Sequence, residues 1–399
     1  MKRYTREIFV FLLVVSCTFL FTAISSSSEK EPVVAEVNSD DEIIEEQPFS
    51  IEAYPEEASK EVRNKLDSLL KRINKRHDFH GAVLVSKKGK VVYNNQIGFA
   101  NFQKKTTLNK ESAFQLASVS KQFTAAAIML LHERNQIKLT DSVNDYFPNF
   151  PYHGVTIENL LNHTAGLPKY FWVAEHKWHE EHAPRNKEMM ALLESSKVQR
   201  FYKPGYKFDY SNTNYMVLAS IVEEVSGMSF SKFVKTNIFD PLQMNNSYVY
   251  SFENDSIKKN QLKGYRLYKG WRHLPINNTV NDAIVGDKNV YSTTEDLFKW
   301  TVSLNEGKLL SKESLELMYA QGETINGRKI PYGFGFRIDT KEQNSIYHHG
   351  KWNGFSTGLT QYIDEDLVVV VLEHTGYKAI KALSKTIKGI VAEHMALDS

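Results

Sequence analysis

Segments with the composition of β-strands lie at both ends of the folded part of this 399-residue chain, with helical segments between them. Near the N-terminal end, residues 81–86 and 90–93 are rich in valine and flank a Lys-Lys-Gly turn, which predicts a hairpin whose second strand would continue at 98–102. Further strands are expected near the C-terminus at 333–339, 345–349, 355–363 and 367–373. The simplest way to bury both groups is to pair them in one antiparallel sheet.

Segments with helical periodicity fill most of the chain between the two groups of strands and also lie before the first group and after the last. At 56–79, apolar residues recur at helical spacing between lysines and arginines, whereas the run that begins at Ser118 is apolar around most of its circumference, as a buried helix is. Further helices are expected at 156–162, 212–226, 229–237, 294–305 and 377–395. We therefore predict an α+β fold, an antiparallel sheet flanked by helices with an adjoining all-helical region.

The first 28 residues have the layout of an export signal. Three basic residues precede an apolar run of 17 residues, 8–24, which is shorter than the roughly 20 residues of a membrane-spanning helix. Its single cysteine, Cys17, follows Val-Val-Ser and resembles the lipidated residue of a bacterial lipoprotein. Three outcomes fit the segment: cleavage near 23–28, lipidation of Cys17, or an uncleaved anchor. All three place the protein outside the cytoplasm, in the periplasm or cell envelope.

Charge divides the remaining chain into two parts. Residues 29–61 hold 12 acidic side chains but only two lysines, so 29–57 is predicted to be a solvated, disordered linker. The folded domain is expected at 58–399, where basic residues exceed acidic ones. These basic residues are scattered along the sequence, without a basic stripe interleaved with aromatic residues, which argues against a nucleic-acid partner.

One serine–lysine pair could supply a nucleophile and its base. Ser118 and Lys121 are three residues apart at the start of the buried helix, a spacing that makes their side chains neighbours on one face. A lysine amine held beside a serine hydroxyl is able to take its proton and activate the oxygen. The spacing alone is not specific, since Ser68…Lys71 and Ser229…Lys232 repeat it.

Two further short motifs carry polar groups suited to catalysis. Tyr210 and Asn212 stand at the start of a predicted helix, where a phenol is able to relay a proton and an amide to hold a carbonyl. His348 and Gly350 end a predicted strand, where glycine lets a ligand approach the backbone. Each motif also has a competitor of the same form, Tyr93…Asn95 and His374…Gly376 respectively.

The ordered set of motifs resembles the serine β-lactamases of class C and their penicillin-binding and esterase relatives. The resemblance runs from about residue 56 to the C-terminus and is carried, besides Ser118 and Lys121, by residues 160–168, 204–205, 208–215, 227–230, 241–244, 291–297, 332–336, 348–350 and 354–355. The order of these blocks selects Ser118…Lys121, Tyr210…Asn212 and His348…Gly350 over their competitors. No single block is specific to the family, but their order is.

The resemblance implies a serine hydrolase that needs no cofactor. In that family Ser118 would be the nucleophile, with Lys121 and Tyr210 managing its proton. Asn212, His348, Gly350 and Lys351 would bind the substrate, with the backbone N–H groups of Ser118 and Lys351 facing the oxyanion. The segment 286–290 replaces a more glycine-rich stretch of the relatives, which leaves the local shape of the site open.

His348 bears on the substrate. It stands where strict β-lactamases have lysine, and histidine lacks the fixed positive charge that would grip a carboxylate. The resemblance therefore favours an ester, amide or D-amino-acid peptide, as a small molecule or derived from peptidoglycan. Two alternatives stay open: a D-Ala-D-Ala carboxypeptidase or β-lactamase of cell-wall metabolism, and a non-catalytic sensor.

One histidine cluster has a different interpretation. His176, His179 and His182 follow one another at three-residue steps on a probable helix, and three histidines on one face would suit zinc. The adjacent glutamates and tryptophans favour a solvated flap beside the active site instead.

Overall fold

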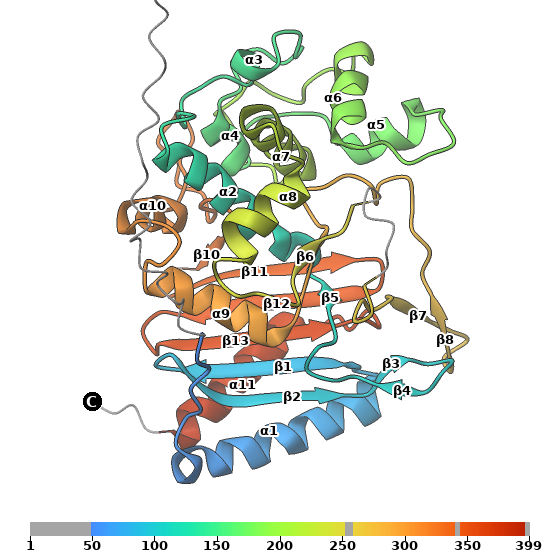
Figure 1. Ribbon diagram of the computed structural model, residues 1–399, viewed down its shortest axis with the longest axis vertical. Helices are drawn as coiled ribbons and strands as arrows, with labels where there is room; N and C mark the ends of the chain where they lie inside the picture. Colours follow the sequence, from blue (N-terminus) through green and yellow to red (C-terminus); the bar gives the residue numbers. More distant parts are fainter. Residues whose placement is uncertain (1–48, 252–257, 340–343, 396–399) are drawn as a thin grey trace, which may run out of the picture. The chain divides into compact units, whose positions relative to one another are not determined.

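A six-stranded antiparallel sheet forms the centre of the molecule (Figure 1). The structure, a computed structural model, describes residues 49–251, 258–339 and 344–395. The strand order is β10-β11-β12-β13-β1-β2, so strands from both ends of the chain meet at the pairing of β13 with β1. The strands are β1 (Gly81–Lys87), β2 (Lys90–Ile97), β10 (Arg337–Asp339), β11 (Ser345–Trp352), β12 (Phe355–Tyr362) and β13 (Leu367–Glu373). This pairing confirms the predicted sheet.

Both faces of the sheet are buried, which explains why its central strands are continuously apolar. Along β13, Val369 and Val371 enter one core, whereas Val368, Val370 and Leu372 enter the other. The two cores arise because successive side chains of a strand point to opposite faces. The smaller core lies beneath two terminal helices, α1 (Glu56–His77) and α11 (Ile380–His394), which lie together on one face of the sheet in Figure 1.

The opposite face carries the larger core and the helical region. Its centre is α2 (Lys121–Glu133), in which residues 121–131 are all buried, as expected for a helix inside a domain. Around it lie α3 (Val143–Tyr146), α4 (Ile157–Leu161), α5 (Tyr170–Lys177), α6 (Asn186–Ser195), α7 (Asn212–Ser226), α8 (Phe230–Val234), α9 (Thr294–Asn305), α10 (Lys312–Tyr319) and the π-helical turn η2 (Lys235–Phe239). The α+β architecture is therefore as predicted.

Two glycines limit strands that the sequence pattern extends too far. The predicted continuation of β2 turns away at Gly98, where φ is 99°, and β3 (Phe99–Asn101) pairs instead with β4 (Thr106–Thr107). The predicted strand 333–339 forms only at β10, because Gly335 has φ of 81° and its N–H donates to the Tyr215 hydroxyl. Positive φ is incompatible with an extended strand, and glycine adopts it without steric cost.

Two smaller sheets were not predicted. One is β5-β9-β6, formed by β5 (Phe114–Gln115), β9 (Val290–Ser292) and β6 (Tyr248–Val249). The other is a separate hairpin of β7 (Tyr265–Tyr268) and β8 (Arg272–Pro275), at the side of the molecule in Figure 1. The strands of both sheets have at most four residues, too few for a periodic signal to stand out.

Most of the predictions for the N-terminal region concern residues that lie outside the described ranges. The export signal at 1–28, with Cys17, lies there, as does most of the linker at 29–57. Ordered backbone begins before the expected boundary at 58, since the Tyr54 N–H donates to the Val91 carbonyl at 2.8 Å. Within the described ranges, no helix is both long and apolar enough to cross a bilayer.

Candidate active site

Ser118 lies in a short turn between the sheet and the buried helix. The 3₁₀ turn η1 (Ala117–Ser120) follows β5 and leads directly into α2 at Lys121. Ala117 has φ of 50°, an uncommon conformation for a residue with a side chain. The Leu116 N–H donates to the Val290 carbonyl at 2.8 Å, which ties the turn to β9. The helix therefore begins at Lys121 rather than at Ser118, and the serine precedes it on a strained, partly buried turn.

The ammonium of Lys121 is at the centre of this site. Its Nζ lies 3.3 Å from Ser118 Oγ, 2.8 Å from Asn212 Oδ1 and 2.8 Å from the Asp287 carbonyl oxygen. A lysine ammonium has three donors and no acceptor, so these three contacts use all of them. Lys121 has no solvent-exposed surface. Turn η1, helix α7 and the segment 286–290 are thereby joined at one nitrogen.

Burial changes the acid–base chemistry of this lysine. It lowers the pKa of Lys121 to about 7, an effect that the negative charge of Asp287 opposes and the positive charge of Arg337 increases. Near neutral pH a substantial fraction of the amine is therefore uncharged. An uncharged amine beside a serine hydroxyl is able to accept its proton.

Tyr210 lies immediately before α7 and contacts both cations of the site. Its ring centroid is 5.1 Å from Lys121 Nζ and 4.9 Å from the Arg337 guanidinium carbon. Its hydroxyl is buried and makes no direct hydrogen bond of good geometry within the described part of the chain. Burial raises the pKa of Tyr210, whereas the nearby Ser118 hydroxyl and the charge of Arg337 lower it. The net result is a raised pKa, so the phenol keeps its proton at neutral pH.

His163 packs against the ring of Tyr210. It belongs to the 160–168 block and has φ of 61°, and its ring centroid lies 4.4 Å from that of Tyr210. Its Nδ1 accepts a hydrogen bond from the Ser211 N–H at 3.2 Å, which links the loop to the start of α7. His163 thus has a positioning role that its place in the sequence block did not reveal.

His348 is a neutral, hydrogen-bonded residue. Its Nδ1 lies 2.9 Å from the His349 carbonyl oxygen, which is only able to accept, so Nδ1 carries a proton. Its Nε2 accepts from the Tyr332 hydroxyl at 3.1 Å. Burial, together with the charges of Lys121 and Arg337, holds the pKa of His348 well below its usual range. This position therefore supplies no positive charge at neutral pH.

Gly350 allows β11 to approach the Ser118 turn. A Cβ at this position would lie 2.2 Å from the Leu116 carbonyl oxygen and 2.9 Å from the Ala117 Cβ, distances that real Cβ atoms do not reach. The Thr357 hydroxyl of the neighbouring strand donates to the same Leu116 carbonyl at 2.6 Å. Lys351 follows Gly350 on β11, with an exposed side chain, and pairs with Ser356 of β12.

Asp287 and its neighbours were not identified from sequence, although their segment was noted as divergent. The Asp287 carboxylate accepts from the Tyr170 hydroxyl at 2.9 Å and lies 3.2 Å from Lys288 Nζ. Lys288 Nζ lies 5.2 Å from the Tyr170 ring centroid and 5.3 Å from that of Trp352. This buried network holds the backbone whose carbonyl contacts Lys121. No local pattern marks it, since its members come from α5, β11 and the 286–290 segment.

The competing motifs have other roles. The Ser68 hydroxyl donates to the Asn64 carbonyl on α1, and Ser229 caps α8. The Tyr93 hydroxyl donates to Asp67. His374 bonds the carbonyl oxygens of Lys263 and Phe99. Of the three serine–lysine pairs, only Ser118 and Lys121 share a hydrogen bond between their side chains.

The three histidines considered as a zinc site do not share a helix face. Helix α5 ends at Lys177, between His176 and His179. The prediction that all three histidines lie on one helix is therefore wrong. His182 Nε2 lies 2.8 Å from Glu188, whereas His176 bonds the Trp172 carbonyl. In the described ranges, the metal-type cluster lies elsewhere, at Asp78, His80 and His273.

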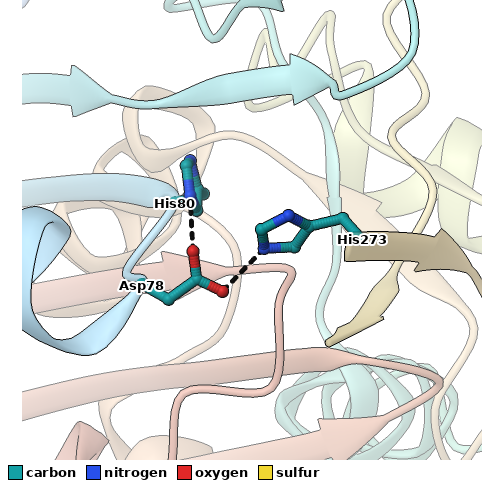
Figure 2. Close-up of side chains that lie close together, drawn as sticks. All are labelled: Asp78, His80 and His273. Carbon is teal, nitrogen blue, oxygen red and sulfur yellow. Dashed lines mark hydrogen bonds and ion pairs between the residues drawn. The ribbon is translucent and has the colours of Figure 1, made fainter. Parts of the chain in front are cut away.

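Figure 2 shows Asp78 between the two histidines of that cluster. His80 Nε2 lies 3.0 Å from one carboxylate oxygen and His273 Nε2 lies 2.6 Å from the other. His80 Nδ1 accepts from the Phe99 N–H at 3.0 Å, so in the neutral ring the proton is on Nε2. That nitrogen donates to Asp78 and has no lone pair for a metal. The arrangement fits a hydrogen-bonded clamp better than a metal site.

Comparison with known proteins agrees with the arrangement of the site. The Beta-lactamase family matches residues 66–386. The chain belongs to that family. Penicillin-binding protein 4* of Bacillus subtilis is 34% identical over 326 residues, covering 78% of this chain and 72% of that protein. Teichoic acid D-alanine hydrolase of Staphylococcus aureus is 25% identical over 375 residues, covering 90% of each chain.

Solved structures of the family share the fold. A penicillin-binding protein from Bacillus halodurans superposes with a TM-score of 0.70 at 25% identity, covering 80% of this chain and 98% of that chain. The resemblance noted from the motifs is thus confirmed. As a Beta-lactamase family member, the chain belongs to a group of serine acyl-transfer enzymes and penicillin-binding proteins.

Replacing Gly350 tests the close approach of β11 to the Ser118 turn. We predict that Gly350→Ala displaces the turn and lowers the free energy of unfolding by about 1–3 kcal/mol, as overpacking does. It should also slow the reaction of Ser118 with a serine-directed phosphonate. Chemical denaturation and labelling rates measure the two effects. Gly389→Ala, at a position where a Cβ meets nothing within 4 Å, is the matched control. Unchanged labelling by Gly350→Ala would contradict the packing argument.

Proposed function

We propose that the protein is an exported serine hydrolase that forms an acyl-enzyme on Ser118 from an ester, amide or D-amino-acid peptide. The observation that carries the proposal is the 3.3 Å contact between Ser118 Oγ and the fully buried Lys121 Nζ. A structural serine needs no buried lysine beside it, and burying an amine is costly unless its altered protonation is used or compensated. Membership of the Beta-lactamase family supports the same chemistry.

In the first step, the Ser118 oxygen attacks the substrate carbonyl as its proton passes to a base. Lys121 contacts the serine directly and Tyr210 lies near it, but Lys121 is the better acceptor because its pKa is lowered to about 7 whereas that of Tyr210 is raised. The N–H groups of Ser118 and Lys351 would stabilise the oxyanion. Such a donor typically contributes about 10²–10³ in rate.

The second half of the first step is departure of the leaving group. Its oxygen or nitrogen needs a proton, which the protonated Tyr210 is placed to donate while Lys121, now charged, lies 5.1 Å from the ring. Water then attacks the acyl-enzyme, its proton returns through the same groups, and Ser118 is released. Asn212 Nδ2 would donate to a substrate carbonyl while its Oδ1 accepts from Lys121.

The neutral His348 directs the substrate proposal away from β-lactams. A cation at this position would bind the carboxylate of a β-lactam, and the neutral His348 would bind that carboxylate more weakly. The names of the relatives point to D-alanyl chemistry, since one is a teichoic acid D-alanine hydrolase. The second candidate is a D-Ala-D-Ala carboxypeptidase or β-lactamase of the cell wall, favoured by the penicillin-binding protein relatives. A non-catalytic sensor is the third.

Location is part of the proposal. The basic, apolar first 28 residues would direct export, with the domain in the periplasm or cell envelope and attached to the membrane if Cys17 is lipidated or the segment is retained. Penicillin-binding protein relatives are consistent with a role at the envelope.

A panel of three substrates separates the candidate functions. We predict turnover of a short-chain aryl ester that exceeds turnover of a chromogenic cephalosporin and a D-Ala-D-Ala peptide. Ser118→Ala should abolish all activity, and Ser68→Ala, from a competing motif on α1, should leave it unchanged. Faster turnover of the peptide or cephalosporin would favour the cell-wall enzyme. No turnover and no acylation by any substrate would favour the sensor and contradict the hydrolase.

The lowered pKa of Lys121 predicts a pH dependence. Below pH 7 the amine is protonated and unable to accept the serine proton, so kcat/KM for the ester should rise about tenfold per pH unit and level off above about pH 7. Lys121→Arg, which stays protonated, should lower kcat/KM by about 10²–10⁴ above pH 7, and the difference from wild type should shrink as the pH falls below 7. Lys71→Arg on α1 is the control. A flat profile between pH 5 and 9 would exclude Lys121 as the base.

A further inference from the structure

The β7–β8 hairpin is basic, aromatic and exposed. Residues 258–281 contain six lysines and arginines and no acidic residue. Four of these cations, Lys263, Arg266, Lys269 and Arg272, are exposed, and in the described part of the chain none has a carboxylate partner. This segment is a local excess of positive charge. A charge balance taken over the whole domain does not show it.

Large apolar side chains are exposed on the same hairpin. Trp271, at the tip, is 72% exposed, the highest value for a large hydrophobic residue in the described ranges. Leu267 and Tyr268 are 43% and 41% exposed. Lys269 and Gly270 both have positive φ, as tight hairpin turns require, and the turn places Trp271 beside them. Exposed apolar side chains that gather on one element, unlike single scattered ones, mark interaction sites.

The strand register separates the hairpin into an inner and an outer face. Residues directly opposite each other point to the same side of an antiparallel pair. Leu267 opposes His273, whose ring packs on Phe102 at 3.7 Å between centroids, so this face turns toward the domain. Tyr268 opposes Arg272 on the outer face, and the Arg266 guanidinium lies 5.8 Å from the Tyr268 ring. Cations and an aromatic ring therefore alternate on the side that faces solvent.

The base of the hairpin is fixed to the domain. His273 bonds Asp78, which also accepts from His80 at the start of β1, as Figure 2 shows. Burial raises the pKa of Asp78, but the hydrogen bonds from His80 and His273 outweigh it and lower the pKa below its usual range. The Tyr265 N–H donates to the His374 carbonyl at 2.8 Å. The hairpin is thus tied to the domain at its base through Tyr265 and near its turn through His273, which reduces the entropy lost when its outer face binds a surface.

We propose that this hairpin docks the domain on an anionic lipid bilayer, with Trp271 in the interfacial region and the four cations at the headgroups. Tryptophan and tyrosine prefer the membrane interface, and basic residues beside an anionic leaflet add binding energy that depends on salt. A soluble polyanion would satisfy the cations, but it offers no apolar phase for Trp271. The combination of the two on one hairpin therefore favours a bilayer.

Trp271 itself reports on docking. The experiment uses the full chain, whose five tryptophans give one emission signal, and compares wild type with Trp271→Phe in vesicles that contain brominated lipids. Residues 1–28 are also apolar and could bind vesicles by themselves, so co-sedimentation would not report on the hairpin. The quantity measured is therefore the Trp271 signal, the difference in emission between wild type and Trp271→Phe. We expect at least half of this signal to be quenched in phosphatidylglycerol vesicles, and little in phosphatidylcholine vesicles or at high salt.

Charge variants complete the test. R266A/K269A/R272A should lower the affinity for anionic vesicles roughly a hundredfold, at about fivefold per charge, and remove the quenching. K65A/K71A/R72A on α1 removes as many exposed charges and should have no effect. The hairpin variant should hydrolyse a soluble ester as wild type does, so failure of docking and failure of the hydrolase are distinguishable. Equal quenching of wild type and Trp271→Phe would overturn the proposal. So would a Trp271 emission change with soluble polyglycerol phosphate but not with vesicles.

Discussion

The burial of one ammonium group, that of Lys121, is the constraint on which the rest of the site depends. Its three acceptors come from a turn, the first residue of a helix and a loop, so each must be held to within hydrogen-bond distance of the same nitrogen. Burial alone would make the charged form costly, and its pKa falls to about 7. Burial of His348, with the charges of Lys121 and Arg337 adding to the effect, also holds the pKa of that histidine well below its usual range. Desolvation of the two side chains thus accounts both for a base at Lys121 and for the absence of charge at the third motif.

The sheet supplies the rigidity that this arrangement requires. Strand β11 lies so close to the Ser118 turn that only glycine fits at Gly350, and Thr357 of β12 bonds the carbonyl just before the turn. Because β13 pairs with β1, the N-terminal and C-terminal strands form one sheet, and one face of this sheet shares a core with α2. The buried network of Asp287, Tyr170 and Lys288 provides equivalent support from the helical side.

Elements with a strong local pattern could be predicted from sequence. Helices α7 and α9 and strand β13 have the predicted bounds, because caps and apolar periodicity mark their ends. What could not be predicted depends on tertiary contacts: Asp287 joins Lys121 across 166 residues, and Gly98 and Gly335 end strands through their backbone conformation. The candidate residues Ser118, Lys121, Tyr210, Asn212 and His348 were chosen from motif order, and the structure gathers them. Their catalytic roles remain proposals.

The most direct test of the account is where a covalent adduct forms. Wild-type protein is treated with a serine-directed phosphonate, digested and mapped by mass spectrometry, with Ser118→Ala and Ser68→Ala in parallel. The account predicts one adduct per chain, on the peptide that contains Ser118, in wild type and Ser68→Ala and none in Ser118→Ala. Equal modification of Ser118→Ala, or an adduct on another serine in wild type, would contradict it.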